Sequence, residues 1–443
     1  MSDLLSIAAS GVRAYQTALT TVSENIAGVG VEGYSRRTVS LAEVSSTGRT
    51  SGTNGVGVRV AGISRATDEP GQVGARSATS DLSKTRSSIQ WLDKIESSLT
   101  GDRLSERVTS FFASARALTA EPGSPALRAG MLGAATSAAI AFSATGSAID
   151  RSTAELDEGA ARAASDLSAL GATMVKVNMG LGQVRPDSSA AAELTDQRDR
   201  LLRQMSELTD VSASFDSLGR VTVQAGGRTG PTLVSADKAG VVSYERSGGA
   251  VSLSVKFAGV ESALTPTGGA LAGVVDGAQR LDSARTSLNA MAADFATAVN
   301  TTQAAGEDLN GVPGEPIFAI GDPATELRVV MDDPAGIAAA SPLGGSRDGS
   351  NLDRLEAARV SGGFEKAATE MVTENAAVLQ QRNTVAEAQT AIREGAITSL
   401  STRTGVDLDN EAVELMRFQQ AYQASSRVIQ VARDTFQSIL EVR

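Results

Sequence analysis

Apolar residues recur every seven positions at both ends of the chain, and this spacing limits the possible folds more than any other feature. In the C-terminal stretch one row consists of Leu408, Leu415, Tyr422, Ile429 and Phe436, and a second row consists of Phe418, Ala432 and Ile439. Neither glycine nor proline occurs after Gly405, so the spacing predicts a long helix with a narrow apolar seam. One helix cannot cover such a seam with its own side chains, and it therefore needs a partner.

The N-terminal stretch carries a seam of the same spacing. Its two rows consist of Leu5, Val12, Leu19 and Ile26, and of Ala8, Tyr15, Val22 and Val29. Gly28, Gly30 and Gly33 make a longer helix costly, so the helix is expected to end there. We expect the two terminal helices to pair as an antiparallel coiled coil. The periodicity leaves one alternative open, in which each is a core helix of one globular domain.

The composition excludes several classes of function. Cysteine and histidine are absent, which rules out disulfides, thiolate or imidazole metal sites, and catalytic dyads or triads that need either residue. The net charge of −11 without any basic cluster argues against a nucleic-acid partner. No secretory signal is recognisable near the start, and no run of about 18 consecutive apolar residues occurs. We therefore expect neither a cleaved signal peptide nor membrane insertion.

The middle of the chain alternates between helical and strand-like patterns. Alternating apolar residues at 38–44 and 56–60 predict two strands. Helical stripes then dominate to about residue 208, and they include an alanine-rich helix over 125–183 whose internal glycines weaken it. Alternation returns over 211–257 and predicts two β-hairpins, after which helical stripes resume.

These patterns predict a mainly α fold with a small β domain. Terminal N- and C-terminal coiled-coil helices, an elongated helical bundle and an inserted β domain are its expected parts. The expected boundaries are 1–37 with 405–443 for the coiled coil, 38–210 with 268–404 for the bundle with short strands, and 211–267 for the β domain.

Three motifs, one near each end of the chain and one in its middle, resemble those of a known family. The N-terminal motif comprises Asn25-Ile26-Ala27 and Gly33-Tyr34-Ser35-Arg36-Arg37, although the loop 28–32 lacks the Asn, Thr and Pro usual in the family. The C-terminal motif comprises Gly405-Val406-Asp407-Leu408-Asp409, Glu411 and Phe418-Gln419-Gln420-Ala421-Tyr422-Gln423-Ala424. The internal motif is the stretch Leu194-Thr195-Asp196-Gln197-Arg198-Asp199-Arg200-Leu201. Together the three motifs resemble the flagellar axial protein family, which builds the rod, hook and filament, and the internal motif is similar to its hook-associated members.

The resemblance implies a structural protein of the bacterial flagellum that self-assembles at the hook–filament junction. It implies a homo-oligomer in a ring or helical segment, with the hook protein and the next hook-associated protein or the filament as neighbours. It also implies an extracellular location reached through the flagellar export apparatus, with the help of an export chaperone. The further outer domain of larger relatives is expected to be absent, because only a short stretch separates Gly321 from the helical pattern at Asn351.

The residues expected to make assembly contacts lie in the two terminal motifs and seams. They are Leu5, Val12, Leu19, Asn25, Ile26, Tyr34, Arg36, Leu408, Leu415, Phe418, Tyr422, Ile429, Phe436 and Ile439. Four of these, Leu415, Phe418, Tyr422 and Ile429, are the hypothetical contacts of the chaperone. By hypothesis the terminal helices are disordered before assembly, because a lone narrow seam is marginal.

Each motif that could indicate an active or binding site lacks a feature that such a site requires. The Gly28-x-Gly30-x-x-Gly33 pattern follows a helical seam rather than a strand, so it does not predict a dinucleotide site. Asp196 and Asp199 alternate with Arg198 and Arg200, which indicates a solvated ion-pair face. The stretch 308–311 resembles half of a calcium loop but lacks the later glutamate.

We therefore expect no catalytic residue, no cofactor and no metal, and a protein that is not an enzyme. Two alternatives remain. One is another axial protein, such as the hook protein, the distal rod protein or flagellin. The other is an extracellular adhesin or enzyme that carries axial-type ends.

Overall fold

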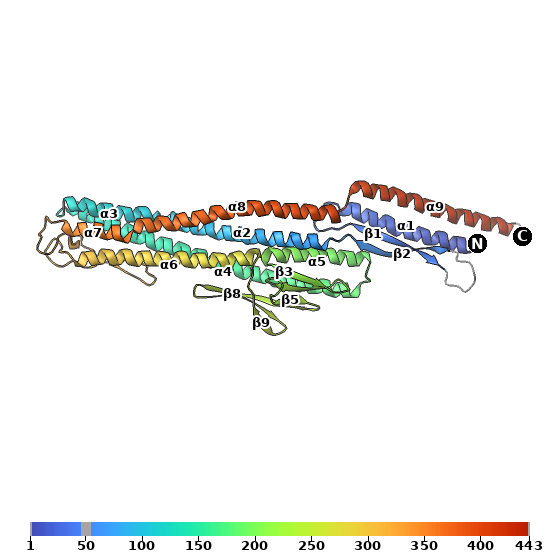
Figure 1. The fold of residues 1–443 in the computed structure, drawn as a ribbon, viewed down its shortest axis with the longest axis horizontal. Helices are drawn as coiled ribbons and strands as arrows, with labels where there is room; N and C mark the ends of the chain where they lie inside the picture. Colours follow the sequence, from blue (N-terminus) through green and yellow to red (C-terminus); the bar gives the residue numbers. More distant parts are fainter. Residues whose placement is uncertain (1, 46–54, 442–443) are drawn as a thin grey trace.

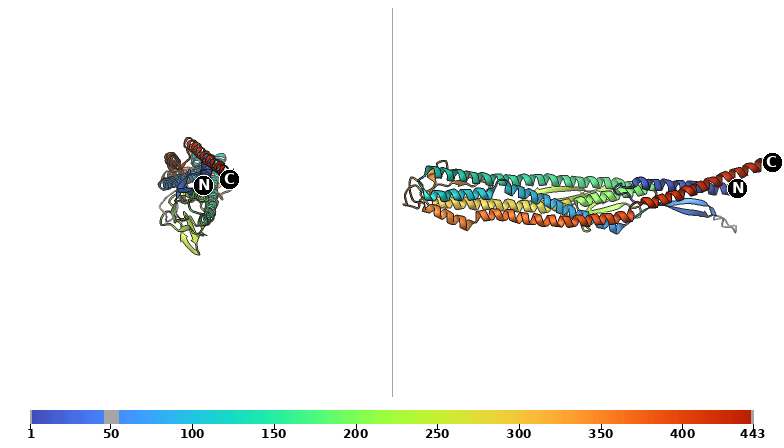
Figure 2. Two further views of the ribbon diagram at one scale, coloured as in Figure 1. Left: turned by 90° about the vertical axis from the view of Figure 1, so that its right-hand side faces the viewer. Right: turned by 90° about the horizontal axis from the view of Figure 1, so that it is seen from above.

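The computed structural model describes residues 2–45 and 55–441, which form an elongated rod whose long helices run along its length (Figure 1). The end-on and side views show how slender the rod is (Figure 2). The helices are α1 (Ser2–Gly28), α2 (Glu69–Gly101), α3 (Leu104–Ala120), α4 (Pro125–Gln183), α5 (Ser189–Leu208), α6 (Gly269–Ala304), α7 (Ser350–Gly362), α8 (Phe364–Thr404) and α9 (Leu408–Glu441). Both ends of the chain lie at the same pole of the rod (Figure 1).

Helix α4 confirms the predicted alanine-rich helix over its full length. Pro125 occupies its first turn, where a missing backbone N–H costs nothing, and the helix continues for 59 residues. Packing explains its glycine at 146, since a Cβ at Gly146 would lie 2.8 Å from the Thr325 hydroxyl. Among the described helices, α4 alone is long and apolar enough to cross a membrane by length and composition. In this fold its apolar stripe is the buried face of the bundle, with Ile149, Leu156 and Leu167 fully buried.

The bundle core at the far end from the termini is built around phenylalanines. Six of the ten, Phe111, Phe112, Phe142, Phe295, Phe318 and Phe364, form one group whose ring centroids lie 5.2–6.1 Å apart. Aromatic pairs at such separations add stability beyond the area they bury. The sparse aromatic content of the chain is therefore concentrated where α3, α4, α6 and α8 meet.

A buried arginine fastens the irregular segment 305–349 at this same end. The Arg128 side chain is 2% exposed and donates hydrogen bonds to the carbonyl oxygens of Pro122, Pro334, Ala335 and Ile337 at 2.6–3.3 Å. Burial lowers the pKa of Arg128, because charge is costly to desolvate. Four carbonyl acceptors offset that cost and hold the segment, including the short 3-10 turn η1 (Pro334–Gly336), against the start of α4.

The predicted β-hairpins are confirmed. One antiparallel sheet has the order β3 (Val211–Phe215), β4 (Val221–Ala225), β5 (Thr232–Ser235) and β6 (Lys238–Ala239), and a second has β7 (Val241–Ser247), β8 (Ala250–Phe257) and β9 (Val260–Ala263). Their inner faces share a second core with α4 and α5, to which Val223, Val234 and Val255 contribute. Tyr244 and Arg246 of β7 both bind Asp157, which fixes the second sheet to α4.

A third hairpin lies along α1 rather than along the bundle. Strands β1 (Arg37–Ser45) and β2 (Gly55–Arg65) pair antiparallel, with Arg37 opposite Arg65. Gly57 approaches α1 so closely that a Cβ there would lie 2.2 Å from the Ser10 hydroxyl oxygen, which also accepts the Val58 N–H at 3.0 Å. The register brings the Arg37 and Arg65 side chains together at the base of the hairpin. Strands β10 (Phe318–Ala319) and β11 (Arg328–Val329) form a minimal pair elsewhere.

Candidate functional site at the joint of the terminal helices

Helices α1 and α9 pack side by side in opposite directions, as the seams predict. Gly11 faces Ser425, where a Cβ on the glycine would lie 2.9 Å from the serine oxygen, so the backbones approach closely. The Tyr15 and Phe418 rings lie 6.4 Å apart. Ala18, Val22 and Phe418 form the small buried core between the helices, with Leu415 packed against it.

The predicted seam residues differ in how far this pairing buries them. Asn25 and Phe418 are buried, whereas Leu5, Val12, Leu19, Ile26, Tyr34, Arg36, Leu415, Tyr422 and Ile429 are half-buried. Leu408 and Phe436 remain 51% and 53% exposed. In the antiparallel register that places Gly11 opposite Ser425, the residues of α9 near Phe436 lie beyond Ser2, where α1 begins. Phe436 therefore has no α1 residue beside it, which explains the exposure of its ring. Ile439 lies in α9, but its side chain falls outside the described residues.

A second set of exposed apolar residues lies on α9 outside the seam that faces α1. It consists of two pairs, Val413 with Met416 and Val428 with Val431, which are 42–63% exposed and which we call the α9 stripe. Gln420 and Arg427 occupy the same side of the helix between the two pairs. At about 100° per residue, Val413 and Val431 lie roughly 140° around the helix from Phe418. This stripe was not predicted, because its residues lie outside the seven-residue rows. The spacing of three between Val413 and Met416, repeated at Val428 and Val431, was the available signal.

Asn25 organises the joint where the helix pair meets the bundle. Its side chain is buried and uses all its hydrogen-bonding capacity. The amide nitrogen donates to the Arg37 carbonyl at 2.8 Å and to Glu411 at 3.0 Å, while the oxygen accepts the Arg37 N–H at 2.9 Å and the Tyr34 hydroxyl at 3.0 Å. Burial raises the pKa of Tyr34, which keeps the hydroxyl protonated as the donor.

Glu411 ties the start of α9 to the N-terminal motif. Its carboxylate is 1% exposed and accepts hydrogen bonds from the Arg36 guanidinium at 2.6 Å and from the Asn25 amide nitrogen. The Arg36 backbone N–H donates to the Thr404 carbonyl at the end of α8 at 2.8 Å. These contacts join two motifs that lie at opposite ends of the sequence.

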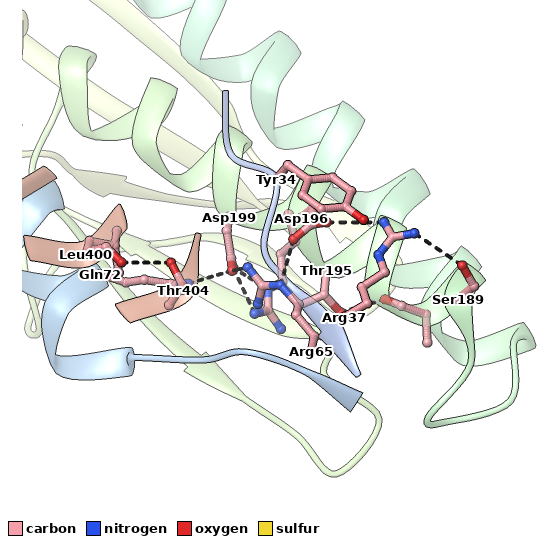
Figure 3. Close-up of polar contacts among 12 residues, drawn as sticks. Tyr34, Arg37, Arg65, Gln72, Ser189, Thr195, Asp196, Asp199, Leu400 and Thr404 are labelled. Carbon is pink, nitrogen blue, oxygen red and sulfur yellow. Dashed lines mark hydrogen bonds and ion pairs between the residues drawn. The ribbon is translucent and has the colours of Figure 1, made fainter. Parts of the chain in front are cut away.

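The internal motif on α5 supplies the third side of the joint (Figure 3). Arg65 binds Asp196 and Asp199 at 2.6 Å each, and Arg37 binds Asp196 at 3.3 Å. Both carboxylates and Arg198 are less than 9% exposed. Burial alone would raise the pKa of Asp199, but the Arg198 and Arg65 guanidinium groups outweigh it and hold that pKa below its usual value.

The predicted solvated ion-pair face over Asp196–Arg200 is therefore wrong. The carboxylates do form ion pairs, and Asp199 pairs with the interleaved Arg198 at 2.8 Å, but these groups are buried rather than solvated. Their other partners, Arg37 and Arg65, come from the β1–β2 hairpin. Arg198 is also buried, where it donates to the Gly219 carbonyl at 2.6 Å and lies over the Phe215 ring. The function of Arg65 was missed, because nothing in its local sequence marks it.

The other motifs form ordinary turns. The glycines at 28–33 make a loop after α1, with Gly28 against the Tyr34 ring, so this is not a strand-to-helix phosphate loop. The Asp308 carboxylate accepts the backbone N–H groups of Asn310 and Val312, which closes the turn on itself. Within the described ranges no group of three or more acidic residues is placed to hold a metal ion.

Comparisons with known families agree with this arrangement of motifs. The model of the flagellar hook-associated protein FlgK helical domain matches residues 89–318, more than half of the chain. The model of the flagellar basal body rod FlgEFG protein C-terminal region matches residues 401–442. The second match covers the C-terminal motif shared with rod and hook proteins, whereas the first includes the internal motif on α5.

Individual relatives carry the same description. The chain is 27% identical to flagellar hook-associated protein 1 of Escherichia coli (strain K12) over 342 residues, which cover 73% of this chain and 61% of that protein. It is 28% identical over 341 residues to the Salmonella typhimurium protein of that name, covering 73% and 60%. The match thus spans about three fifths of those relatives. A Bacillus subtilis protein of the same name is 22% identical over 98% of this chain and 97% of its own length.

A solved structure shares the fold. The flagellar hook junction protein FlgK from Burkholderia pseudomallei superposes with a TM-score of 0.66 at 14% identity, covering 75% of this chain and all of that one. The matched helical domain, the relatives and the meeting of three motifs at one joint lead to one assignment: the chain belongs to the flagellar hook-associated protein FlgK family.

Proposed function

We propose that this chain is a structural component of the bacterial flagellum that self-assembles at the hook–filament junction. The observation that carries the proposal is the unpartnered stripe of Val413, Met416, Val428 and Val431 on α9. The terminal helices already use one seam for each other, so this stripe is available for a neighbouring copy. Family membership supports the same role.

The stripe is large enough to matter in an assembly. Full burial of a large apolar side chain contributes about 1.5–3 kcal/mol, so half-exposed residues gain roughly 1 kcal/mol each. Four such residues give about 4 kcal/mol per subunit before ordering costs. A ring of copies repeats that gain at every contact, whereas an isolated copy does not obtain it.

The neighbours in this proposal are the hook protein on one side and the next hook-associated protein or the filament on the other. The location in this proposal is extracellular, reached through the flagellar export apparatus. The proposed chaperone contacts Leu415, Phe418, Tyr422 and Ile429 lie on or beside the seam that faces α1. A chaperone bound to that seam would occupy the surface of α9 that α1 otherwise covers. This agrees with terminal helices that pair with each other only after export.

The alternatives have less support. The shared C-terminal match alone would suit a rod or hook protein, but the matched FlgK helical domain favours the hook-associated role. For an enzyme or adhesin, the β domain offers a cavity of about 190 Å³ beside Asp216 and Arg220. Those two side chains pair with each other at 2.7 Å as the β3–β4 turn, which leaves neither free for acid–base work.

The proposal is tested by charge substitutions on the α9 stripe. Val413→Asp with Val431→Asp should leave the monomer folded, because both side chains are exposed, and should abolish incorporation into flagella and swimming in cells that lack the native protein. Leu343→Asp, at a 96% exposed position outside the terminal helices, is the matched control. Normal incorporation of the α9 variant would refute the stripe as an assembly surface.

A second experiment addresses the order of the ends. Circular dichroism and limited proteolysis would compare the full chain with residues 38–404. Rapid clipping of the ends in the isolated full chain would support folding coupled to assembly. Protected helical ends would show that the α1–α9 pair forms in the monomer, and the chaperone hypothesis would then require active separation of the pair.

A further inference from the structure

A cavity of about 390 Å³ lies at the joint, on the side that faces α2 and α8. One wall is the loop of residues 28–35, which we call the hinge loop. The opposite wall includes Ala75 of α2 and Leu400 of α8, and Arg65 and Asp199 also line the cavity. The cavity is partly open to solvent, so the surrounding segments can move into it by displacing water.

The bonds across the joint are distributed unevenly. Toward α5, Glu24 accepts the Ser189 hydroxyl at 3.1 Å, Arg65 binds Asp199 at 2.6 Å and Glu32 binds Arg203 at 3.1 Å. Across the cavity, within residues 2–45 and 55–441, no hydrogen bond or ion pair joins the hinge loop itself to α2 or α8. The nearest contact is made by the residue that follows the loop, Arg36, whose backbone N–H donates to the Thr404 carbonyl at the last residue of α8. The hinge-loop valines at 29 and 31 remain 40% and 56% exposed.

The chain segments that connect the terminal helix pair to the bundle can also bend. The chain crosses three times, through residues 29–36, 66–68 and 405–407, and each crossing is non-helical. Gly30 has φ +78°, and a Cβ there would touch nothing within 4 Å, so packing does not fix this position. No helix among the described elements runs continuously from the terminal pair into the bundle, since α8 ends at Thr404 and α9 begins at Leu408.

We propose that the joint is a one-sided hinge. The pair α1–α9 swings toward α8, the hinge loop closes the cavity, and the ion pairs of Arg65 with Asp196 and Asp199 serve as the pivot. Bending toward α5 is blocked by steric contact, because α1 and the hairpin already lie against that helix at bonding distance. The motion belongs to the single chain, so it goes beyond the proposed role in assembly and does not depend on it.

The experiment measures distances across the joint in the isolated full chain. The sequence contains no cysteine, so spin labels attach only to Val413→Cys on α9 and Ile392→Cys on α8, both exposed positions. Double electron–electron resonance should give a distribution with a population at shorter distances, which corresponds to the closed hinge. Adding Ser401→Trp places an indole at the wall of the cavity and should remove that population.

Thr402→Trp is the matched control, because this neighbouring residue is exposed and does not line the cavity. It should leave the distribution unchanged. If Ser401→Trp alters the helical circular dichroism signal, Ala75→Leu fills the same cavity from α2 and should have the same effect. A single distance population that no variant changes would overturn the hinge, as would equal loss of the short distances with Thr402→Trp. Both results would leave the proposed assembly role standing, since that role is tested by incorporation into flagella.

Discussion

Arg65→Met should open the joint selectively. Arg37, Arg65, Asp196, Arg198 and Asp199 form a buried polar cluster at the joint. Arg65 makes the shortest contacts in this cluster, 2.6 Å to each of Asp196 and Asp199, and its side chain is 7% exposed. Removing one member of a buried ion pair typically costs about 3–5 kcal/mol, because the remaining charge is left buried and unpaired. Asp196 retains Arg37 and Asp199 retains Arg198, so we expect the lower end, about 3 kcal/mol.

Amide hydrogen exchange measures this local opening without requiring the whole chain to unfold in one step. The reporters are the backbone N–H groups of Arg36 and Arg37, which bond to the Thr404 carbonyl and the Asn25 side chain. A loss of about 3 kcal/mol corresponds to exchange about 100-fold faster. Arg162→Met is the control, because its pair with Glu158 is over 70% exposed on both sides and should contribute at most about 1 kcal/mol.

The pH dependence provides an independent check of the mechanism. The pKa of Asp199 is depressed in the folded chain, so its contribution is present above the unfolded pKa of about 3.9 and is lost as the pH falls through the folded value. The difference between the Arg65→Met variant and the unmodified chain should therefore be largest at neutral pH and shrink in acid. Exchange at Arg36 and Arg37 that is unchanged, or a difference that does not depend on pH, would refute the buried ion-pair reasoning.

Three further substitutions test other parts of the fold. Asn25→Ala should lower the free energy of the same local opening by about 2 kcal/mol and so accelerate the amide exchange, since it removes four hydrogen bonds and leaves the buried N–H and carbonyl of Arg37 without their Asn25 partner; an unchanged rate would contradict its central place. Arg128→Met should increase proteolysis within residues 305–349, because the carbonyl groups of Pro334, Ala335 and Ile337 lose the side-chain donor that joins them to α4; resistance equal to that of the unmodified chain would count against this. Gly277→Ala should lower the urea midpoint followed by the single tryptophan, Trp91, because the new Cβ would lie 2.5 Å from its ring, at a cost of about 1–3 kcal/mol. Gly130→Ala, where the same atom meets nothing within 4 Å, should instead raise stability by about 0.5–1 kcal/mol.

Local sequence patterns were sufficient for the elements and for the antiparallel pairing of the ends. Pro125 marks the first turn of α4, the glycines at 28–33 end α1, and the seven-residue rows identify α1 and α9 as partners. These features depend on residues near one another in the chain, or on a period that two segments share. The hairpins at 211–225 and 241–257 were likewise visible from alternation.

The polar cluster could not be predicted in the same way. Whether Asp196 and Asp199 face water or a guanidinium depends on where the β1–β2 hairpin lies, and that is a property of the tertiary fold. Arg65 ends an ordinary strand, so its role appears only when Arg37 is seen opposite it. The family motif predicted that Asn25 matters, but its four hydrogen bonds depend on the tertiary fold and could not be predicted from the sequence.

The placement of both chain ends at one pole has a practical consequence for labelling. A fluorescent protein or affinity tag fused to either end would sit beside the paired helices and their exposed stripe, and would interfere with whatever those helices contact. The turn around Leu343, whose side chain is 96% exposed, belongs to the irregular segment at the opposite pole. A short epitope inserted there would report on the protein in cells while leaving both ends native.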